Sequence, residues 1–227
     1  MVIASAVARM MPDKQKKSPE LAAYTLAVEA HPRRTPCVSL NLRMLPRSGP
    51  HAAGREAIAP IMAAGPVLDG KVQLMPYQNL LPATVSVHHA EQPLSEVRSG
   101  LLPHITAEVA GAAESALKSG RVPMVQYRSV GGAVNDVAPD ATAYAHRSQN
   151  FAVMSAAFPA DVAALDAYWQ QLGPYLDGVY VSFESRFDDR LLRAAFPGGT
   201  LQRLRALKAE YDPEQVFRDN FPIPPAL

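Results

Sequence analysis

The stretch that decides the fold lies near the end of the chain, where residues 203–225 read RLRALKAEYDPEQVFRDNFPIPP. Apolar positions recur at helical spacing from just before this stretch, at Leu201, Leu204 and Leu207. The basic residues of this segment point away from the apolar side of such a helix, and we interpret the surface that carries them as solvated. Pro213 cannot continue a helix, because it lacks a backbone N–H and its ring clashes with the preceding turn. The sequence therefore predicts a helix that ends before Pro213, followed by a proline-rich tail.

The composition is that of an ordinary globular protein. The chain has 227 residues, 48% hydrophobic and 19% charged, which is enough for a full core in one large domain. A formal net charge of +1 gives no electrostatic basis for binding nucleic acid or an anionic membrane, so neither is expected as a partner. No apolar run reaches the roughly 18 residues of a membrane helix. The first residues lack a secretory signal pattern, so we expect a cytoplasmic protein.

The single cysteine, Cys37, excludes an internal disulfide and a thiolate-rich metal site. Because Val38 follows it, we interpret Cys37 as a core residue of a strand. His88 and His89 are neighbours on a predicted strand and face opposite sides of it, which argues against a shared metal site. No metal is expected.

Apolar periodicity divides the chain into short elements. We expect a helix and polar linker over 1–19 and one domain over 20–227, with a closing segment from about 199. Strands are predicted near 24–28, 38–42, 85–88, 122–130, 151–157 and 179–183. Helices are predicted at 52–64, at 105–118, from an N-cap at Asp161 to Leu172, and twice before the tail. Gly131 and Gly132 are interpreted as a tight turn. This mixture predicts an α+β fold, an antiparallel sheet with helices covering one face.

Several motifs in the same order resemble those of the berberine-bridge-enzyme-like (BBE-like) FAD-linked oxidases, which are flavoproteins of the VAO/PCMH type. The tail resembles the family's Y-D-P-x-x-x-F-R-x-N and I-P-P. Residues 131–134 (GGAV) and 141–147 (ATAYAHR) resemble G-G-A-V and A-T-A-F-x-H-R. Residues 65–67 (GPV), 75–77 (MPY), 98–102 (RSGLL) and 180–183 (YVSF) resemble further segments. The resemblance covers about residues 20–225 and corresponds to the C-terminal, substrate-binding half of these oxidases, without their N-terminal FAD-binding domain.

The resemblance implies FAD as the cofactor and a sheet whose second face roofs the substrate pocket opposite the flavin ring. Neither of the family's covalent flavin anchors can be located in this chain, and no glycine-rich phosphate loop is present in the sequence. We therefore expect that the chain alone does not bind FAD tightly, and that a separate FAD-binding chain is a possible partner. Asn220 would approach the flavin only where a flavin domain is present.

The resemblance also places pocket-facing positions at Arg128, Val153 and Phe183, with further pocket positions at Tyr77, His88 and Ser182. A general base needs a titratable group within hydrogen-bonding reach of the substrate, and neither Val153 nor Phe183 has one. The candidates for a catalytic group are Tyr180 and Tyr127, with His88 and His146 also open.

Each of these polar residues has a structural alternative. His146 fits a structural hydrogen-bonding role better than a catalytic one. Tyr180 is expected to pack in the core with its hydroxyl satisfied. Arg128 could bind a carboxylate or phosphate of the substrate, or form a salt bridge at a surface or interface.

Three functions remain open from the sequence, and we favour the first of them. The chain could be the substrate-binding half of an oxidase that acts on a small organic molecule, sugar or secondary metabolite with a separate flavin domain. It could be a flavin-free enzyme that reuses the pocket for a non-redox reaction such as cyclisation. It could also be a non-catalytic binding or remnant protein. A sheet face without its flavin domain would expose apolar surface, so a homo-oligomer is expected.

Overall fold

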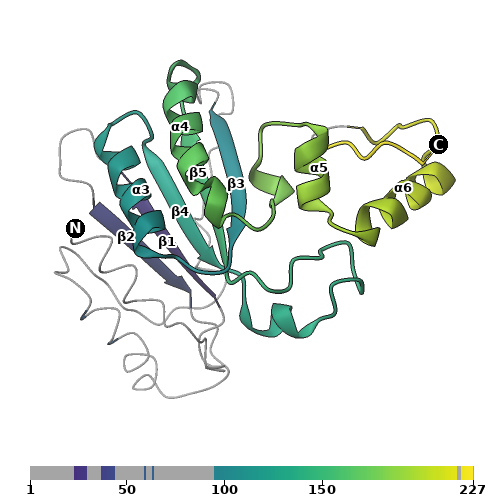
Figure 1. Cartoon of the computed structure of the whole chain (residues 1–227), viewed down its shortest axis with the longest axis horizontal. Coiled ribbons are helices and arrows are strands. Elements are labelled where there is room, and N and C mark those ends of the chain that lie inside the picture. Colours follow the sequence, from purple (N-terminus) through teal and green to yellow (C-terminus); the bar gives the residue numbers. More distant parts are fainter. Residues whose placement is uncertain are drawn as a thin grey trace, which may run out of the picture.

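The computed structural model describes residues 23–29, 37–43, 59, 63, 95–218 and 221–226, and only the backbone of 23–29 and 37–43. Its centre is a five-stranded antiparallel sheet in the order β2-β1-β4-β5-β3 (Figure 1). The strands are β1 (Ala23–Glu29), β2 (Cys37–Arg43), β3 (Glu96–Leu102), β4 (Met124–Ser129) and β5 (Phe151–Ala157). The strand predictions at 24–28, 38–42, 122–130 and 151–157 are thereby confirmed.

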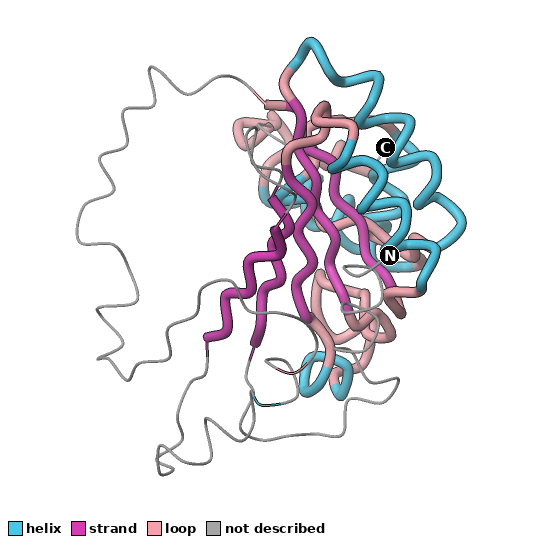
Figure 2. Tube along the Cα trace, turned by 90° about the vertical axis from the view of Figure 1, so that its left-hand side faces the viewer, coloured by secondary structure: helices cyan, strands magenta, loops and turns pink. Residues whose placement is uncertain are grey.

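Two helices, α3 (Ala107–Lys118) and α4 (Val162–Leu172), cover one face of this sheet (Figure 2). Alternate strand residues point to that face, so the main core forms between the sheet and the two helices. Its largest fully buried side chains are Tyr127, Leu102, Leu117, Leu165, Leu172, Val109, Val122, Val125 and Val153. The predicted α+β fold with helices on one face is confirmed.

The ends of these helices follow their sequence signals only in part. The Thr106 hydroxyl accepts a hydrogen bond from the Val109 N–H and caps α3, and Gly120, at φ 70°, follows the end of α3. Asp161 is the N-cap residue of α4, as predicted, but its side chain makes no capping hydrogen bond. Its carboxylate instead accepts a hydrogen bond from Arg121 Nε at 2.9 Å, because the loop before β4 brings that guanidinium close.

Residues 179–183 do not form the predicted strand. The segment covers the outer edge of β3 at its two ends: Leu101 N–H donates to Gly178 O at 3.0 Å, and Ser185 N–H donates to Val97 O at 3.1 Å. The segment between Gly178 and Ser185 is longer than the part of β3 between Val97 and Leu101. Its extra residues therefore cannot pair in register with β3. It turns instead into the short 3-10 helix η6 (Val181–Phe183).

The end of the chain lies beside the sheet, together with the loop over 131–149 (Figure 1). The helices there are α5 (Asp189–Ala195) and α6 (Gly199–Tyr211), and α6 ends before Pro213 as predicted. Leu191 and Ala195 of α5 pack with Val179 in a second, small apolar cluster. The remaining short 3-10 helices are η3 (Gly132–Asp136), η4 (Pro159–Asp161) and η5 (Gly173–Tyr175).

Several predictions lie outside the described residues. These are the helix and linker over 1–19, the strand at 85–88, and the helix at 52–64 except for Ala59 and Ala63. The strand position of Cys37 is confirmed, while its burial stays a prediction. Within the described part of the chain, no helix is long and apolar enough to cross a membrane.

Candidate substrate site

The candidate site lies on the second face of the sheet, the one that α3 and α4 do not cover. Strand residues alternate between the two faces, and Val125 and Tyr127 pack under the helices, so Gln126 and Arg128 of β4 point to the second face. The antiparallel register sets Ala152 opposite Arg128 and Met154 opposite Gln126. This part of the face therefore combines one cation and one amide with two apolar neighbours on β5.

Arg128 is held in place from two sides. Its Nε donates a hydrogen bond to Gln126 Oε1 at 2.7 Å. Its guanidinium carbon lies 4.5 Å from the centroid of the Phe183 ring, within the range of a cation–π contact. The structure thus brings together two of the predicted pocket residues, Arg128 and Phe183. No carboxylate among the described residues forms an ion pair with Arg128.

Tyr180 lies next to this pair and is more open than its sequence suggests. Its ring is 5.7 Å from that of Phe183, and 36% of the residue is exposed. The expected core packing of Tyr180 is therefore wrong, because η6 turns this residue out of the sheet instead of extending it along β3. Ser182, the middle residue of η6, is also exposed. Both stay candidates for contact with a substrate.

Tyr144 is a residue that the sequence reasoning missed. Burial raises the pKa of its phenol, Arg147 opposes that shift, and the nearby Tyr180 adds to it. The guanidinium of Arg147 stands 5.1 Å from the Tyr144 ring centroid. A signal was present, because Tyr144 stands where the family motif A-T-A-F-x-H-R has phenylalanine. The substitution adds a hydroxyl to the surroundings of Tyr180.

Tyr127 and Val153 lie on the wrong face for the predicted pocket. They oppose each other in the register of β4 and β5, and both are buried under the helices. The Tyr127 hydroxyl is 3.5 Å from that of Tyr168, and burial raises the pKa of Tyr127 to about 12. A phenol in that environment is not accessible to a substrate and stays protonated at neutral pH, so it cannot act as a general base. The geometry therefore does not support the catalytic role expected of Tyr127.

His146 has the structural role expected of it. The residue is buried, and its Nε2 lies 3.0 Å from the carbonyl oxygen of Ala195 in α5. Burial lowers the pKa of His146, although hydrogen bonds to the backbone of Ala195 and Ala194 and the nearby Asp177 oppose this shift. The neutral imidazole therefore joins the 141–147 segment to the end of α5.

The remaining site predictions stay untested by the geometry. Tyr77, His88 and Asn220 lie outside the described residues. In the part of the chain that the structure describes, no group of histidine, cysteine or acidic side chains could hold a metal ion.

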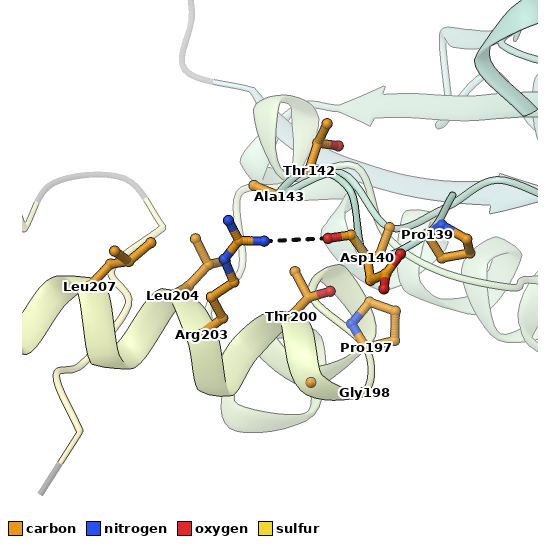
Figure 3. A pocket seen from close by; sticks show the side chains of 12 residues that line it. Pro139, Asp140, Thr142, Ala143, Pro197, Gly198, Thr200, Arg203, Leu204 and Leu207 are labelled. Atoms are coloured by element: carbon orange, nitrogen blue, oxygen red, sulfur yellow. Dashed lines mark hydrogen bonds between the residues drawn. The ribbon is translucent and has the colours of Figure 1, made fainter. Parts of the chain in front are cut away.

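A hollow of about 670 Å³ lies apart from this face, between the 139–145 loop and the first turns of α6 (Figure 3). Arg203 spans it, and its Nη1 donates to the backbone oxygen of Asp140 at 3.3 Å. Thr142 and Thr200 line it from opposite sides, among prolines, glycines and leucines. This hollow is open, and it shares no lining residue with the group formed by Arg128, Phe183 and Tyr180.

Comparison with known proteins shows which family and which solved folds this chain resembles. Residues 193–224 match the family model described as berberine and berberine like. The match contains α6, the YDP turn and the proline-rich tail. It confirms the resemblance to the BBE-like FAD-linked oxidases.

Two curated relatives are uncharacterised FAD-linked oxidoreductases of Bacillus subtilis. YvdP is 32% identical over 103 residues, which cover 42% of this chain and 23% of YvdP. YgaK is 27% identical over 196 residues, which cover 78% of this chain and 41% of YgaK. The chain therefore spans less than half the length of either relative.

Solved structures of oxidases share the fold at low sequence identity. A variant of BBE-like 1 from Physcomitrella patens has a TM-score of 0.76 at 18% identity and covers 100% of this chain. Glucooligosaccharide oxidase of Acremonium strictum has a TM-score of 0.73 at 18% identity over 99% of this chain. The corresponding values for 6-hydroxy-D-nicotine oxidase of Arthrobacter nicotinovorans are 0.71, 18% and 99%. In each case the match spans about half of the neighbour, 52%, 53% and 52% respectively.

The described residues fit the substrate side of a flavin site, but they do not fit the part of such a site that binds the dinucleotide. The second face of the sheet offers Arg128 and the aromatic residues of the η6 region, which could face a substrate and a ring system. A dinucleotide also needs a cradle for its pyrophosphate, usually backbone N–H groups of a glycine-rich loop at a helix start. The described chain offers no glycine-rich phosphate loop on this face.

Proposed function

We propose that this chain is the substrate-binding half of a BBE-like FAD-linked oxidoreductase that oxidises a small organic molecule. The flavin would be held by a domain outside the 227 residues, on a second polypeptide or in a longer chain. The observation that carries the proposal is the group formed by Arg128, Phe183 and Tyr180 on the second face of the sheet. The oxidase-like fold, with oxidases of sugars and of a nicotine derivative among its neighbours, supports it.

In this proposal the chain binds and orients the substrate, and FAD, when bound by its own domain, accepts the hydride. Phe183 and Tyr180 form an aromatic wall, and Arg128 is a fixed cation beside it. Holding a substrate in a reactive orientation contributes much of the rate in such a reaction. Tyr180 is partly exposed and its hydroxyl can hydrogen-bond to a substrate hydroxyl, and Tyr180 lies close enough to Tyr144 to add to the raised pKa of the Tyr144 phenol.

The test compares the recombinant chain with the same chain purified natively from its source cells through an affinity tag. Under the proposal, the recombinant chain is colourless, while the native complex shows the visible absorption of a flavin, which bleaches when a substrate reduces it. A yellow recombinant chain would mean that these residues hold FAD themselves. A colourless native complex would overturn the proposal and favour a flavin-free enzyme or a binding protein.

A further inference from the structure

We propose that the substrate of this site carries a carboxylate on a planar, apolar body, and that Arg128 binds that carboxylate. The inference rests on the proposed function, since it names the substrate class for the same face of the sheet.

Arg98 of β3 and Arg128 of β4 have described side chains and point to opposite faces of the sheet. Arg98, on the helix face, is 2% exposed, with its Nε 3.0 Å from Asp166 Oδ1 and its Nη1 3.1 Å from Glu96 Oε2. Burial opposes its charge, and the bonds to Asp166 and Glu96 nevertheless raise its pKa. This is the usual arrangement, because a guanidinium removed from water needs an anion to offset its desolvation.

Arg128 has no such anion among the described residues, although it is half-buried. Its two fixed contacts, with Gln126 and Phe183, are both uncharged. The bond through Nε leaves the N–H groups of both Nη atoms available, since a guanidinium has five donors. The side chain is thus held in one orientation with its remaining donors unused, which is a geometry suited to an incoming anion.

The surroundings favour a carboxylate on an apolar ring over inorganic phosphate, which has no apolar part, and over a neutral sugar. Phe183 and Tyr180 form an aromatic wall, and Ala152 and Met154 form the neighbouring floor on β5. A planar ring can lie against these apolar groups while its carboxylate meets the fork of the guanidinium with two parallel hydrogen bonds. A neutral sugar would leave the positive charge without a counterion.

The test uses the whole 227-residue chain and three probes: sodium benzoate, neutral benzamide and inorganic phosphate. Affinities of wild type and variants are measured by isothermal titration calorimetry. The ¹H–¹⁵N resonance of Arg128 Nε, assigned by its disappearance in Arg128→Lys, locates the binding site in wild type. We expect benzoate to shift this resonance and to bind at least about tenfold more tightly than benzamide, because a charge-assisted bidentate pair is much stronger than a neutral hydrogen bond. Arg128→Lys should weaken benzoate binding by about tenfold or more, because lysine cannot form the planar fork.

Arg121→Lys is the matched control. Arg121 is exposed and already paired with Asp161, so its replacement should leave benzoate binding unchanged. Circular dichroism identifies any variant that fails to fold. Equal binding of benzoate and benzamide, equal or tighter binding of phosphate, no binding of benzoate, or full binding by Arg128→Lys would each overturn the inference.

The probes need no flavin, so the two proposals fail separately. A colourless native complex together with Arg128-dependent benzoate binding would overturn the oxidase and keep the carboxylate site. A yellow native complex without benzoate binding would keep the oxidase and overturn the carboxylate site.

Discussion

Gly178 sets the path of the segment that carries the aromatic residues of the site. Its carbonyl oxygen accepts the Leu101 N–H at the edge of β3, and its φ of 121° lies in a region that side chains disfavour. A Cβ at this position would stand 2.4 Å from Cε1 of His146. The histidine is itself tied to α5 through Ala195, so neither side has room to shift.

We therefore expect Gly178→Ala to lower the free energy of unfolding by about 2–4 kcal/mol, the combined cost of backbone strain and overpacking. Urea denaturation followed by circular dichroism measures it. Gly111→Ala is the control, because a Cβ at Gly111 in α3 meets nothing within 4 Å. It should leave stability unchanged or raise it by up to about 1 kcal/mol, the difference in helix propensity. Equal losses in the two variants would contradict this explanation.

The sequence predicts the residues of the site correctly only where the alternation of side chains along a strand is taken into account. The resemblance pointed to Arg128 and Phe183, which lie in contact in the folded chain. It also pointed to Val153, while Tyr127 was chosen for its chemistry, and both are buried under the helices. Because neighbouring strand residues face opposite sides, Arg128 and Tyr127 cannot share one pocket wall. Applied to β4, that rule excludes one of the two from the pocket on the sequence alone.

At the scale of elements, a charged cluster joins α4 to the edge of the sheet. Arg98 of β3 donates to Asp166 of α4, and Arg186 lies 4.0 Å from the same carboxylate oxygen. Arg186 also pairs with the buried carboxylate of Glu184, which accepts the Ser99 N–H. The cluster therefore connects β3, α4 and the segment that follows η6.

We expect Asp166→Asn to lower the free energy of unfolding by about 1–3 kcal/mol, because the buried Arg98 then keeps Glu96 as its only carboxylate partner among the described residues. Asp161→Asn is the matched control, since its pair with Arg121 is solvent-exposed and such pairs contribute at most about 1 kcal/mol. Thermal unfolding of both variants, at low and at high salt, provides the comparison. A larger loss in Asp161→Asn would show that the cluster does not anchor α4.

The same cluster explains why the sequence did not predict β3. The motif at residues 98–102 resembles a family segment, yet a buried arginine and Gly100 interrupt the apolar alternation that identifies a strand. Gly100 is there because Leu176 and Trp169 pack against it, a contact between distant parts of the chain. The opposite error occurred at 179–183, where apolar residues suggested a strand. Strand propensity is a property of single residues. It cannot predict that the 178–185 segment is too long to pair in register with β3.

At the scale of the whole molecule, the chain spans about half of each solved structure compared above. Its C-terminal turn exposes apolar side chains to solvent. The Asp212 carboxylate accepts the N–H groups of Val216 at 2.7 Å and Phe217 at 3.1 Å, and Lys208 binds both Asp212 and the Phe217 carbonyl oxygen. This built turn keeps Phe217 82% exposed, next to the exposed Val216 and Tyr211. Apolar residues fixed outward in one segment are typical of a surface that contacts another chain.

The self-association expected from the sequence can be tested on this turn. We expect wild type to show concentration-dependent association in sedimentation velocity experiments, and Phe217→Ser to weaken it by about tenfold or more, as removal of an exposed aromatic anchor does. The free energy of unfolding should change by no more than about 0.5 kcal/mol, because the side chain contributes little to the core. Phe158→Ser, a 47% exposed phenylalanine after β5, is the control and should associate like wild type. If both variants associate as wild type does, the exposed turn is not the contact, and the second face of the sheet becomes the surface to test.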